Sequence, residues 1–212
     1  MIQDVAIYGA GGFGRETVLL LDQINQEKKR WNLVGFFDDG MHQQNVVDNI
    51  PVLGGLQQLN DHARPIAVIF AIADPLIRRR VVRSVKNSGV TFPSVIHPQS
   101  IVDLKRNRLG NGAIVTAGNI FTLNISIGDF VIVNLLNSIG HDTVIGNYCT
   151  VMPGCSLSGN VVIGEATMIG TGARILQNLT IGKMCKVGAG AVVTKDFSDE
   201  VTIVGVPAVE LK

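Results

Sequence analysis

Apolar residues recur at every sixth position through the second half of the chain. The series runs from Leu109 to Val193, and every position in it carries an aliphatic side chain or, at Phe121, an aromatic one. Because 46% of the chain is hydrophobic, such a run would arise by chance on the order of once in 10⁵ trials at a given phase. A period of six matches neither a helix nor a simple strand. It predicts short strands joined by corners in a regular coil, with three hexads to each triangular turn.

Two other phases of this repeat predict the corners and the interior of the coil. A glycine often follows the apolar position, as at Gly110 and Gly164, which is typical of a tight corner that needs a residue without a Cβ atom. Four positions after the apolar residue the side chain is usually small, and we expect these side chains to stack inward. All three cysteines occupy this inward phase, so we interpret them as packing residues rather than nucleophiles or metal ligands. They are Cys149, Cys155 and Cys185.

Residues 1–95 have a different pattern, in which strand-like runs alternate with helical ones. Strands are predicted over 5–8, 33–37 and 66–72, and helices over 13–26 and from Pro75 to about residue 88. Such alternation predicts a small parallel sheet covered by helices. The sequence therefore predicts two domains, a Rossmann-like nucleotide-binding domain over 1–95 and a β-helix with a C-terminal tail over 96–212.

A glycine pattern lies between the first predicted strand and the first helix. Gly9, Gly11 and Gly14 form G-x-G-x-x-G, and at such a turn the backbone and the helix N-terminus can receive a phosphate. Asp38 and Asp39 end the second strand, where a carboxylate can accept hydrogen bonds from a ribose. The alternative is that the glycines only close a turn and the aspartates only cap a strand. Because the repeat leaves room for one such half, a mononucleotide or nucleotide sugar fits better than a dinucleotide.

Charge and composition narrow the classes of function. Eighteen Lys and Arg against 17 Asp and Glu give a formal charge of +1, so we expect no basic field that would collect nucleic acid or anionic lipid. No apolar stretch approaches the length of a membrane span, and the N-terminus lacks the features of a secretory signal. The odd number of cysteines argues against a disulfide framework. We expect a cytoplasmic protein that is not inserted into a membrane.

The motifs of both halves resemble one family. The repeat over 109–193 is similar to the left-handed β-helix of hexapeptide-repeat acyltransferases, and VGVPAVELK resembles their C-terminal segment. With YGAGGFGRE, FFDD, AIADPLIRRR and NSIGHDTVIG, the chain resembles the bacterial sugar acetyltransferases that modify UDP-linked 4-amino sugars, and the sialic acid O-acetyltransferases. The resemblance implies a left-handed parallel β-helix and a homotrimer. It also implies acetyl-CoA as cosubstrate, bound in the cleft between neighbouring prisms, and no metal.

One histidine within the regular coils carries the candidate chemistry. His141 occupies a corner beside Asp142, and an imidazole is suited to take a proton from an amine or hydroxyl that attacks a thioester. The resemblance implies the same role for His141, with Asp142 as its orienting acid. It also implies that the N–H of Gly159 binds the oxyanion. The alternatives are an ordinary exposed histidine and an ordinary corner glycine.

The resemblance assigns further residues to the substrate and the cosubstrate. It implies a uridine nucleotide pocket made by Gly9, Gly11, Gly14, Asp38, Asp39 and the segment from Ala71 to Arg78, in which Ala73 replaces a common glycine. Asn134 matches a residue near the acceptor sugar, with an inward ladder of Asn134 and Asn137 as the alternative. Thr150 stands where some relatives carry a second histidine near the thioester. For coenzyme A the resemblance implies contacts from the backbone at Thr171 and Ala189 and from the ammonium group of Lys195, which could also be an ordinary exposed charge.

We therefore hypothesise that the chain transfers the acetyl group of acetyl-CoA to an amino group of a UDP-linked amino sugar, for surface polysaccharide or glycoprotein synthesis. One alternative is O-acetylation of sialic acid or a related sugar, and another is an inactive nucleotide-sensing scaffold. A zinc enzyme built on the same repeat would need three histidines, and the coils contain one.

Overall fold

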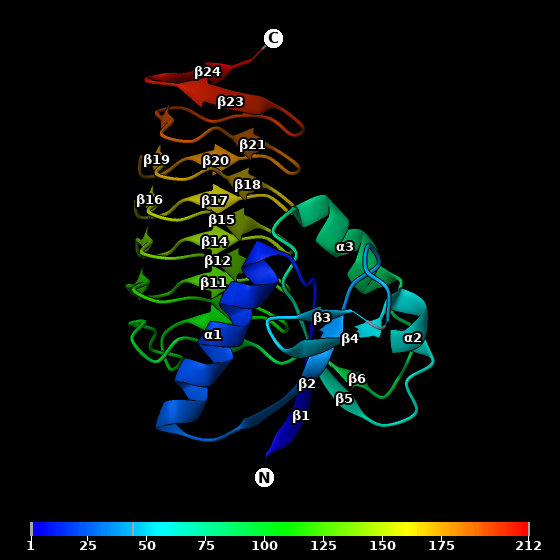
Figure 1. The fold of residues 1–212 in the computed structure, drawn as a ribbon. Helices are drawn as coiled ribbons and strands as arrows, with labels where there is room; N and C mark the ends of the chain where they lie inside the picture. Colours follow the sequence, from blue (N-terminus) through cyan, green and yellow to red (C-terminus); the bar gives the residue numbers. More distant parts are fainter. Residues whose placement is uncertain (1, 44, 212) are drawn as a thin grey trace.

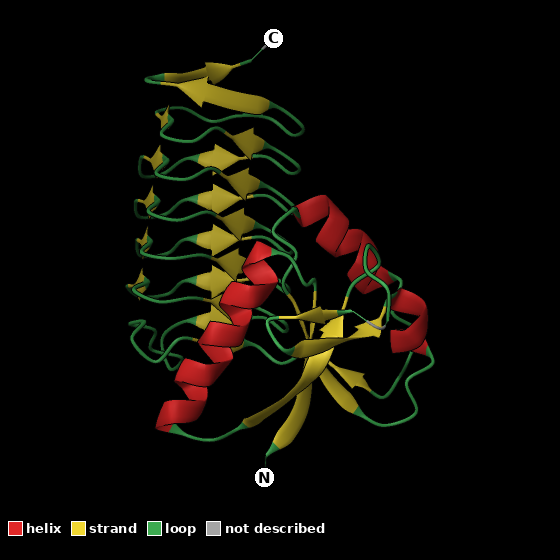
Figure 2. Cartoon of the chain, viewed as in Figure 1, coloured by secondary structure: helices red, strands yellow, loops and turns green. Residues whose placement is uncertain are grey.

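A triangular prism of stacked short strands stands beside a smaller α/β unit (Figure 1). The computed structural model describes residues 2–43 and 45–211. Figure 2 shows that the helices are confined to the smaller unit, whereas the prism consists of strands and turns. Among the described residues, no helix is long and apolar enough to cross a membrane.

The N-terminal unit is a six-stranded sheet with three helices. Its strand order is β3-β4-β2-β1-β5-β6, and the strands pair in parallel except for the β3–β4 hairpin. The strands are β1 (Gln3–Tyr8), β2 (Trp31–Phe37), β3 (Val46–Val47), β4 (Ile50–Gly54), β5 (Ile66–Phe70) and β6 (Val90–Thr91). The helices are α1 (Gly12–Glu27), α2 (Leu56–Asn60) and α3 (Pro75–Arg83).

The prism has three faces, each a sheet of strands from successive coils. The first face contains β7 (Val95–Ile96), β9 (Ile114–Val115), β12 (Ile132–Val133), β15 (Thr150–Val151), β18 (Met168–Ile169), β21 (Lys186–Val187), β23 (Thr202–Gly205) and β24 (Ala208–Glu210). The second contains β10 (Ile120–Phe121), β13 (Ser138–Ile139), β16 (Ser156–Leu157), β19 (Arg174–Ile175) and β22 (Val192–Val193). The third contains β8 (Arg108–Leu109), β11 (Ser126–Ile127), β14 (Val144–Ile145), β17 (Val162–Ile163) and β20 (Thr180–Ile181). The division predicted at residue 95 falls on β7, which already pairs with β9.

The coil geometry confirms the predicted repeat. Ile132 pairs with Ile114 on one side and with Thr150 on the other, so each face repeats after three hexads. The six-residue series from Val115 to Val193 is buried, and so are the three cysteines. Burial raises the pKa of the Cys149 thiol to about 12, which fits packing rather than nucleophilic chemistry. At Gly164 an added Cβ would lie 2.5 Å from the carbonyl carbon of Gly182, so close stacking of the coils requires glycine there.

Two predicted elements of the N-terminal unit end earlier than expected, and the first is the strand over 66–72, which ends at Phe70. The last helix ends at Arg83 rather than near residue 88, because the chain turns at Ser84 and the following segment binds α2. There the amide of Lys86 donates to the side chain of Asn60, and the Asn87 side chain donates to the carbonyls of Leu59 and His62. The β3–β4 hairpin and α2 were not predicted.

The N-terminal unit covers the first face of the prism and the corner between the third and first faces. Ile114 and Ile132 point outward from the first face into a core cluster that includes Leu21 and Ile24 of α1. At the adjoining corner, the rings of Phe130 and Tyr148 stack at 5.5 Å, and Phe130 meets Phe70 of β5 edge to face. These contacts join the two units through a continuous apolar interface.

Arg78 of α3 is a buried cation at this interface. Its guanidinium donates to the carbonyls of Phe130 at 2.9 Å and of Tyr148 at 2.7 Å, and to the hydroxyl of Thr150 at 3.0 Å. It also donates to the carbonyl of Ile72 in its own unit. Burial lowers the pKa of Arg78 to about 10, which leaves the group charged at neutral pH. The side chain therefore ties the segment before α3 to two coils of the prism.

We predict that Arg78→Met lowers the free energy of unfolding by about 3 kcal/mol, because it leaves several buried carbonyl groups without a donor. Chemical denaturation measures the change. Arg83→Met on the same helix is the matched control. Arg83 is mostly exposed; among the described residues its one ion pair is 3.5 Å long, and its guanidinium lies 5.8 Å from the centre of the Tyr148 ring, so its loss changes stability by less than about 1 kcal/mol. Equal effects of the two substitutions would contradict a special role for Arg78.

Candidate active site

The backbone of the prism turns His141 outward at the corner between the second and third faces. His141 follows β13, and Asp142 adopts a left-handed conformation with φ of 61°. Asn124 and Asn160, one coil before and one coil after, adopt the same conformation with φ of 56°. Asn and Asp tolerate this conformation better than most residues. The side chain of His141 is 61% exposed, so its ring is free to meet a substrate.

Hydrogen bonds orient the imidazole of His141. Its Nδ1 lies 2.8 Å from Oδ2 of Asp142, and the other carboxylate oxygen accepts from the Asn124 side chain at 3.2 Å. The hydrogen bond from His141, and then that from Asn124, hold the pKa of the Asp142 carboxyl below its ordinary value. Because a carboxylate only accepts, Nδ1 carries the proton and Nε2 presents its lone pair. This arrangement prepares Nε2 to act as a base.

Gly159 lies directly beneath the ring, on the next coil. An added Cβ at Gly159 would lie 2.4 Å from Nε2 of His141 and 2.5 Å from Cε1, so any other residue here would displace the ring from this position. Among the described residues, no acceptor takes the N–H of Gly159. A base nitrogen and a free backbone donor thus lie side by side, as the addition of an amine to a thioester requires.

The glycine turn of the N-terminal unit combines packing with an open surface. Gly9 has a φ of 105°, and a Cβ there would lie 2.9 Å from the carbonyl oxygen of Ala71. A Cβ at Gly14 would lie 1.9 Å from the carbonyl oxygen of Gly9. Gly11, by contrast, has nothing within 4 Å of its Cβ direction. Close packing of the turn therefore explains why Gly9 and Gly14 are glycines, whereas Gly11 leaves space for a ligand.

The paired aspartates hold this turn in place. Oδ2 of Asp38 accepts from the amide of Ala10 at 2.8 Å. Oδ2 of Asp39 accepts from the hydroxyl of Tyr8 at 2.7 Å, and its Oδ1 accepts from the amide of Leu56 at 2.8 Å. Burial, and then the bond to Asp39, raise the pKa of Tyr8 above its ordinary value, so the phenol remains a donor. Each carboxylate keeps further lone pairs for a ligand.

A cavity of about 260 Å³ opens at the carboxyl ends of β1, β2 and β5, where open α/β sheets bind their ligands. Asp38 and Asp39 line it together with Tyr8, Gly9, Gly40, Ile72, Ile77, Arg80 and Val81. Arg80 supplies a cation that we did not predict. The only sequence signal for it is the run of three arginines at 78–80. Because successive residues of a helix point in different directions, Arg78 is buried whereas Arg80 is exposed. A second hollow of about 350 Å³ also includes Asp38 and Asp39 and continues along Met41 and residues 54–58.

Three predicted contacts take different positions from those expected. Arg78 does not line the cavity, because its guanidinium is used within the protein. The hydroxyl of Thr150 is buried beneath α3 and donates to the carbonyl of Ala73 at 2.7 Å, so Thr150 cannot replace a histidine near the thioester. Ala73 itself contributes this carbonyl to the interface rather than a wall to the cavity.

Asn134 lies at the corner between the first and second faces, away from His141. It is buried, and its Oδ1 accepts from the amide of Leu135 at 2.8 Å. Asn137 belongs to the interior, where its side chain donates to Oδ1 of Asn119 at 3.1 Å. The inward ladder is therefore formed by Asn119 and Asn137, and a contact of Asn134 with the sugar stays a prediction.

Comparison with known proteins identifies the family. Residues 4–85 match the PglD N-terminal domain, and residues 160–195 match the bacterial transferase hexapeptide (six repeats). GDP-perosamine N-acetyltransferase of Escherichia coli O157:H7 is 36% identical over 143 residues, which span 67% of this chain and 64% of that relative. The acetyltransferase domain of PglB from Neisseria gonorrhoeae FA1090, in complex with acetyl coenzyme A, is 31% identical with a TM-score of 0.88 and full coverage of both chains.

A second solved structure covers the same length. PerB from Caulobacter crescentus, in complex with CoA and GDP-perosamine, is 30% identical with a TM-score of 0.86, over 100% of this chain and 99% of that one. The chain belongs to the hexapeptide-repeat sugar N-acetyltransferases. This result confirms the family, the fold and the class of enzyme predicted from the motifs, with acetyl-CoA as its cosubstrate.

The residues predicted to contact coenzyme A occupy two different corners of this N-acetyltransferase. Thr171 and Ala189 are exposed on successive coils between the first and second faces. Lys195 lies on the corner of His141 and Gly159, with its ammonium 5.6 Å from the centre of the Phe197 ring. Within one chain, therefore, Lys195 does not lie at the same corner as Thr171 and Ala189. Within residues 2–43 and 45–211, no three His, Cys, Asp or Glu side chains gather as a metal site would require.

We predict that His141→Ala raises the pKa of Asp142, because the carboxylate loses the hydrogen bond that contributes most to its stabilisation. Asn124→Ala removes the weaker donor and produces a smaller rise. Carboxyl carbon NMR titrations of the two variants measure the order of the effects. A larger shift in the Asn124 variant would mean that His141 is not the principal partner of Asp142.

Proposed function

We propose that this N-acetyltransferase moves the acetyl group of acetyl-CoA to the amine of a nucleotide-linked amino sugar, with His141 as general base. The observation that carries the proposal is the corner at which Asp142 orients His141 and Gly159 lies beneath its ring. Among the described residues, the N–H of Gly159 has no acceptor. The proposal includes a role in surface polysaccharide or glycoprotein synthesis. It also includes a cytoplasmic location, because acetyl-CoA and nucleotide sugars are cytoplasmic metabolites and the chain has three free cysteines.

In the proposed reaction, each group of this corner has a distinct role. The amine attacks the thioester carbonyl while Nε2 of His141 takes a proton from the amine. The N–H of Gly159 donates to the oxyanion of the tetrahedral intermediate. When the intermediate collapses, the carbon–sulfur bond breaks and the imidazolium returns its proton to the sulfur of coenzyme A. Asp142 stabilises the transient imidazolium and keeps the ring in the required tautomer.

The acceptor nucleotide is proposed to bind the cavity at Asp38 and Asp39. The sequence motifs favour a UDP sugar, whereas two relatives are named for GDP-perosamine or bind it. We therefore propose a GDP-linked amino sugar as the first acceptor to test, with UDP-linked amino sugars as the comparison. Arg80 at the cavity wall is a suitable partner for the diphosphate of either one.

A trimer with sites shared between subunits follows from where these groups lie. The N-terminal unit covers the first face of a triangular prism, and His141 occupies the opposite corner. The nucleotide cavity and His141 of one chain therefore lie on opposite sides of the prism. A cyclic trimer would bring the cavity of one subunit to the His141 corner of another.

The uncovered faces support the same assembly. Exposed aliphatic side chains lie on the second and third faces and on the corners that border the second face, none of which is covered by the N-terminal unit. Exposed aliphatic side chains become buried when such faces pack against other subunits. The residues are Ile101, Ile120, Leu123, Leu135, Leu136, Val144, Val162 and Leu176.

We predict that His141→Ala lowers kcat by roughly 10²–10⁴-fold with little change in acetyl-CoA affinity, because the variant loses its positioned base. Asp142→Ala should cause a smaller loss. Thiol release from acetyl-CoA measures the rate, and calorimetry measures cosubstrate binding. Undiminished transfer by the His141 variant between pH 6 and 9 would rule out the assigned base.

We predict that Asp38→Ala raises KM for the nucleotide sugar at least about tenfold and leaves KM for acetyl-CoA within about twofold, because it loosens the glycine turn of one pocket only. Assays use GDP-linked and UDP-linked amino sugars in parallel. Asp129→Ala, on a corner of the prism and outside this cavity, is the control. An equal rise of both constants would remove the pocket assignment.

We predict that two variants, each impaired in a different half of the shared site, restore activity when mixed. The assay uses a nucleotide-sugar concentration well below the raised KM of Asp38→Ala, where that variant alone turns over little. Trimers formed from equal amounts of His141→Ala and Asp38→Ala chains should recover about a quarter of the wild-type activity, because a quarter of the shared sites combine an intact base with an intact pocket. Subunits are exchanged by mild unfolding and refolding, and light scattering verifies the trimer. No recovery in mixed trimers would place both groups of each site in one chain.

A further inference from the structure

The end of the prism where the first coil begins is built differently from the end where the last coil closes. At the last coil, the β23–β24 hairpin adds Ile203 and Ala208 to the interior core (Figure 1). At the first coil, Ile96 and Leu109 are only partly buried, and Leu104 is 58% exposed beside them. Repeat folds need a polar cap at each end. The first coil therefore leaves apolar side chains open to a partner.

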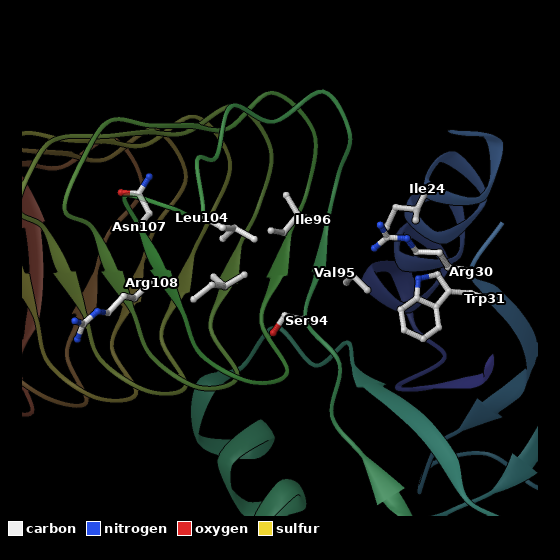
Figure 3. A pocket seen from close by; sticks show the side chains of 10 residues that line it. Ile24, Arg30, Trp31, Ser94, Val95, Ile96, Leu104, Asn107 and Arg108 are labelled. Atoms are coloured by element: carbon white, nitrogen blue, oxygen red, sulfur yellow. The ribbon is translucent and has the colours of Figure 1, made fainter. Parts of the chain in front are cut away.

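A cleft follows this open end. Its first part, of about 530 Å³, lies between the N-terminal unit and the first coils. In Figure 3, Arg30 and Trp31 lie on one side of it, and Leu104, Asn107 and Arg108 lie on the other. A second hollow of about 650 Å³ shares Leu104, Asn107 and Arg108 with the first and continues to residues 124–126. Asn124, which donates to Asp142, lines the second hollow. Neither hollow includes His141, Gly159 or a residue of the cavity at Asp38 and Asp39.

Cations concentrate at this end although the net charge of the chain is only +1. Six exposed basic residues lie along the cleft or directly precede it in the chain, and among the described residues only Arg106 has a carboxylate within 4 Å. They are Lys28, Lys29, Arg30, Lys105, Arg106 and Arg108. Two exposed acidic residues, Glu27 and Asp103, lie beside them in the chain, so the basic residues are in excess by four. Among the described residues, the closing end of the prism instead carries four acidic residues against three basic ones: Asp196, Asp199, Glu200 and Glu210, with Lys183, Lys186 and Lys195. The net charge of the chain therefore predicts no basic field, although the basic residues are concentrated at one end of the prism.

We propose that this basic end docks on an anionic phospholipid surface, without insertion of a helix. Clusters of four to eight Lys and Arg bind anionic lipids, each contributing about 1 kcal/mol near the surface. The exposed side chain of Leu104 supplies an aliphatic group that enters the headgroup region. In the proposed trimer, parallel prisms would present three such ends together and strengthen the attachment.

The exposure of the cations favours a surface over a small anion. Arg30, Lys105, Arg106 and Arg108 are all exposed, so a single soluble phosphate would meet only screened contacts. Asn107, the buried polar side chain of the cleft, uses its Oδ1 to accept from the amide of Ile125 at 2.9 Å. A lipid surface, in contrast, engages all the cations at once.

Vesicle sedimentation tests this proposal. The wild-type protein should bind vesicles of phosphatidylglycerol and phosphatidylcholine at about 0.1 M salt, lose binding as salt rises to about 0.5 M, and ignore pure phosphatidylcholine. Arg30→Glu with Lys105→Glu should weaken binding at least about tenfold. The matched control, Lys183→Glu with Lys186→Glu, makes the same change in net charge at the other end and should retain binding. Both double variants should keep their acetyl-transfer rate without vesicles.

Other outcomes would overturn the proposal. One is that the wild-type protein does not bind anionic vesicles, and another is that the two double variants lose vesicle binding equally. A third is release of the wild-type protein from vesicles by millimolar inorganic pyrophosphate at constant ionic strength, which would indicate a site for soluble phosphates. Binding of a DNA duplex at least as tightly as the vesicles would indicate a nucleic-acid surface. Because acetyl transfer is measured separately, failure of this proposal leaves the proposed function intact.

Discussion

The hydrogen-bonded return of the chain after each coil, which is 18 residues long except at the two ends of the prism, is the constraint on which the rest of the structure depends. It aligns residues 18 positions apart, such as Asn124 with Asp142, so that their side chains bond across coils. The same alignment sets Gly159 beneath His141. The arrangement at this corner is therefore a property of the repeat: neither residue needs a specialised loop, because the stacked backbone already determines their separation.

The second determinant is the way in which the N-terminal unit is fastened to one face. An apolar interface around Ile132 and Phe130 surrounds Arg78, whose guanidinium satisfies carbonyls from both units. A buried cation with several acceptors has strict geometric requirements. It therefore specifies one orientation of the cavity at Asp38 and Asp39 relative to the coils, which a purely apolar contact would specify less strictly.

Much of the prism could be predicted because its information is local and periodic. The inward phase of Cys149 and the close packing at Gly164 both follow from the period alone, and so does the proximity of His141 to Gly159, one coil apart. The N-terminal unit was less predictable. Where α3 ends depends on side chains of Asn60 and Asn87, and the role of Arg78 depends on acceptors more than 50 residues away. Such tertiary contacts leave no periodic trace in the sequence, so Arg78 and Thr150 were assigned to ligands when they in fact bind each other.

Because the coils are stacked, equivalent residues of one corner are separated along the prism axis by a whole number of coils. Lys195 follows His141 by 54 residues, or three coils of 18, which corresponds to roughly 14 Å at about 4.8 Å per coil. A long molecule extended along this corner would meet equivalent positions only at whole-coil intervals. Gain or loss of one coil would preserve the core but move the two residues relative to each other by about 4.8 Å. Evolution of the coil number in such a protein is therefore restricted by the length of the molecule that it handles, even where stability alone would permit more or fewer coils.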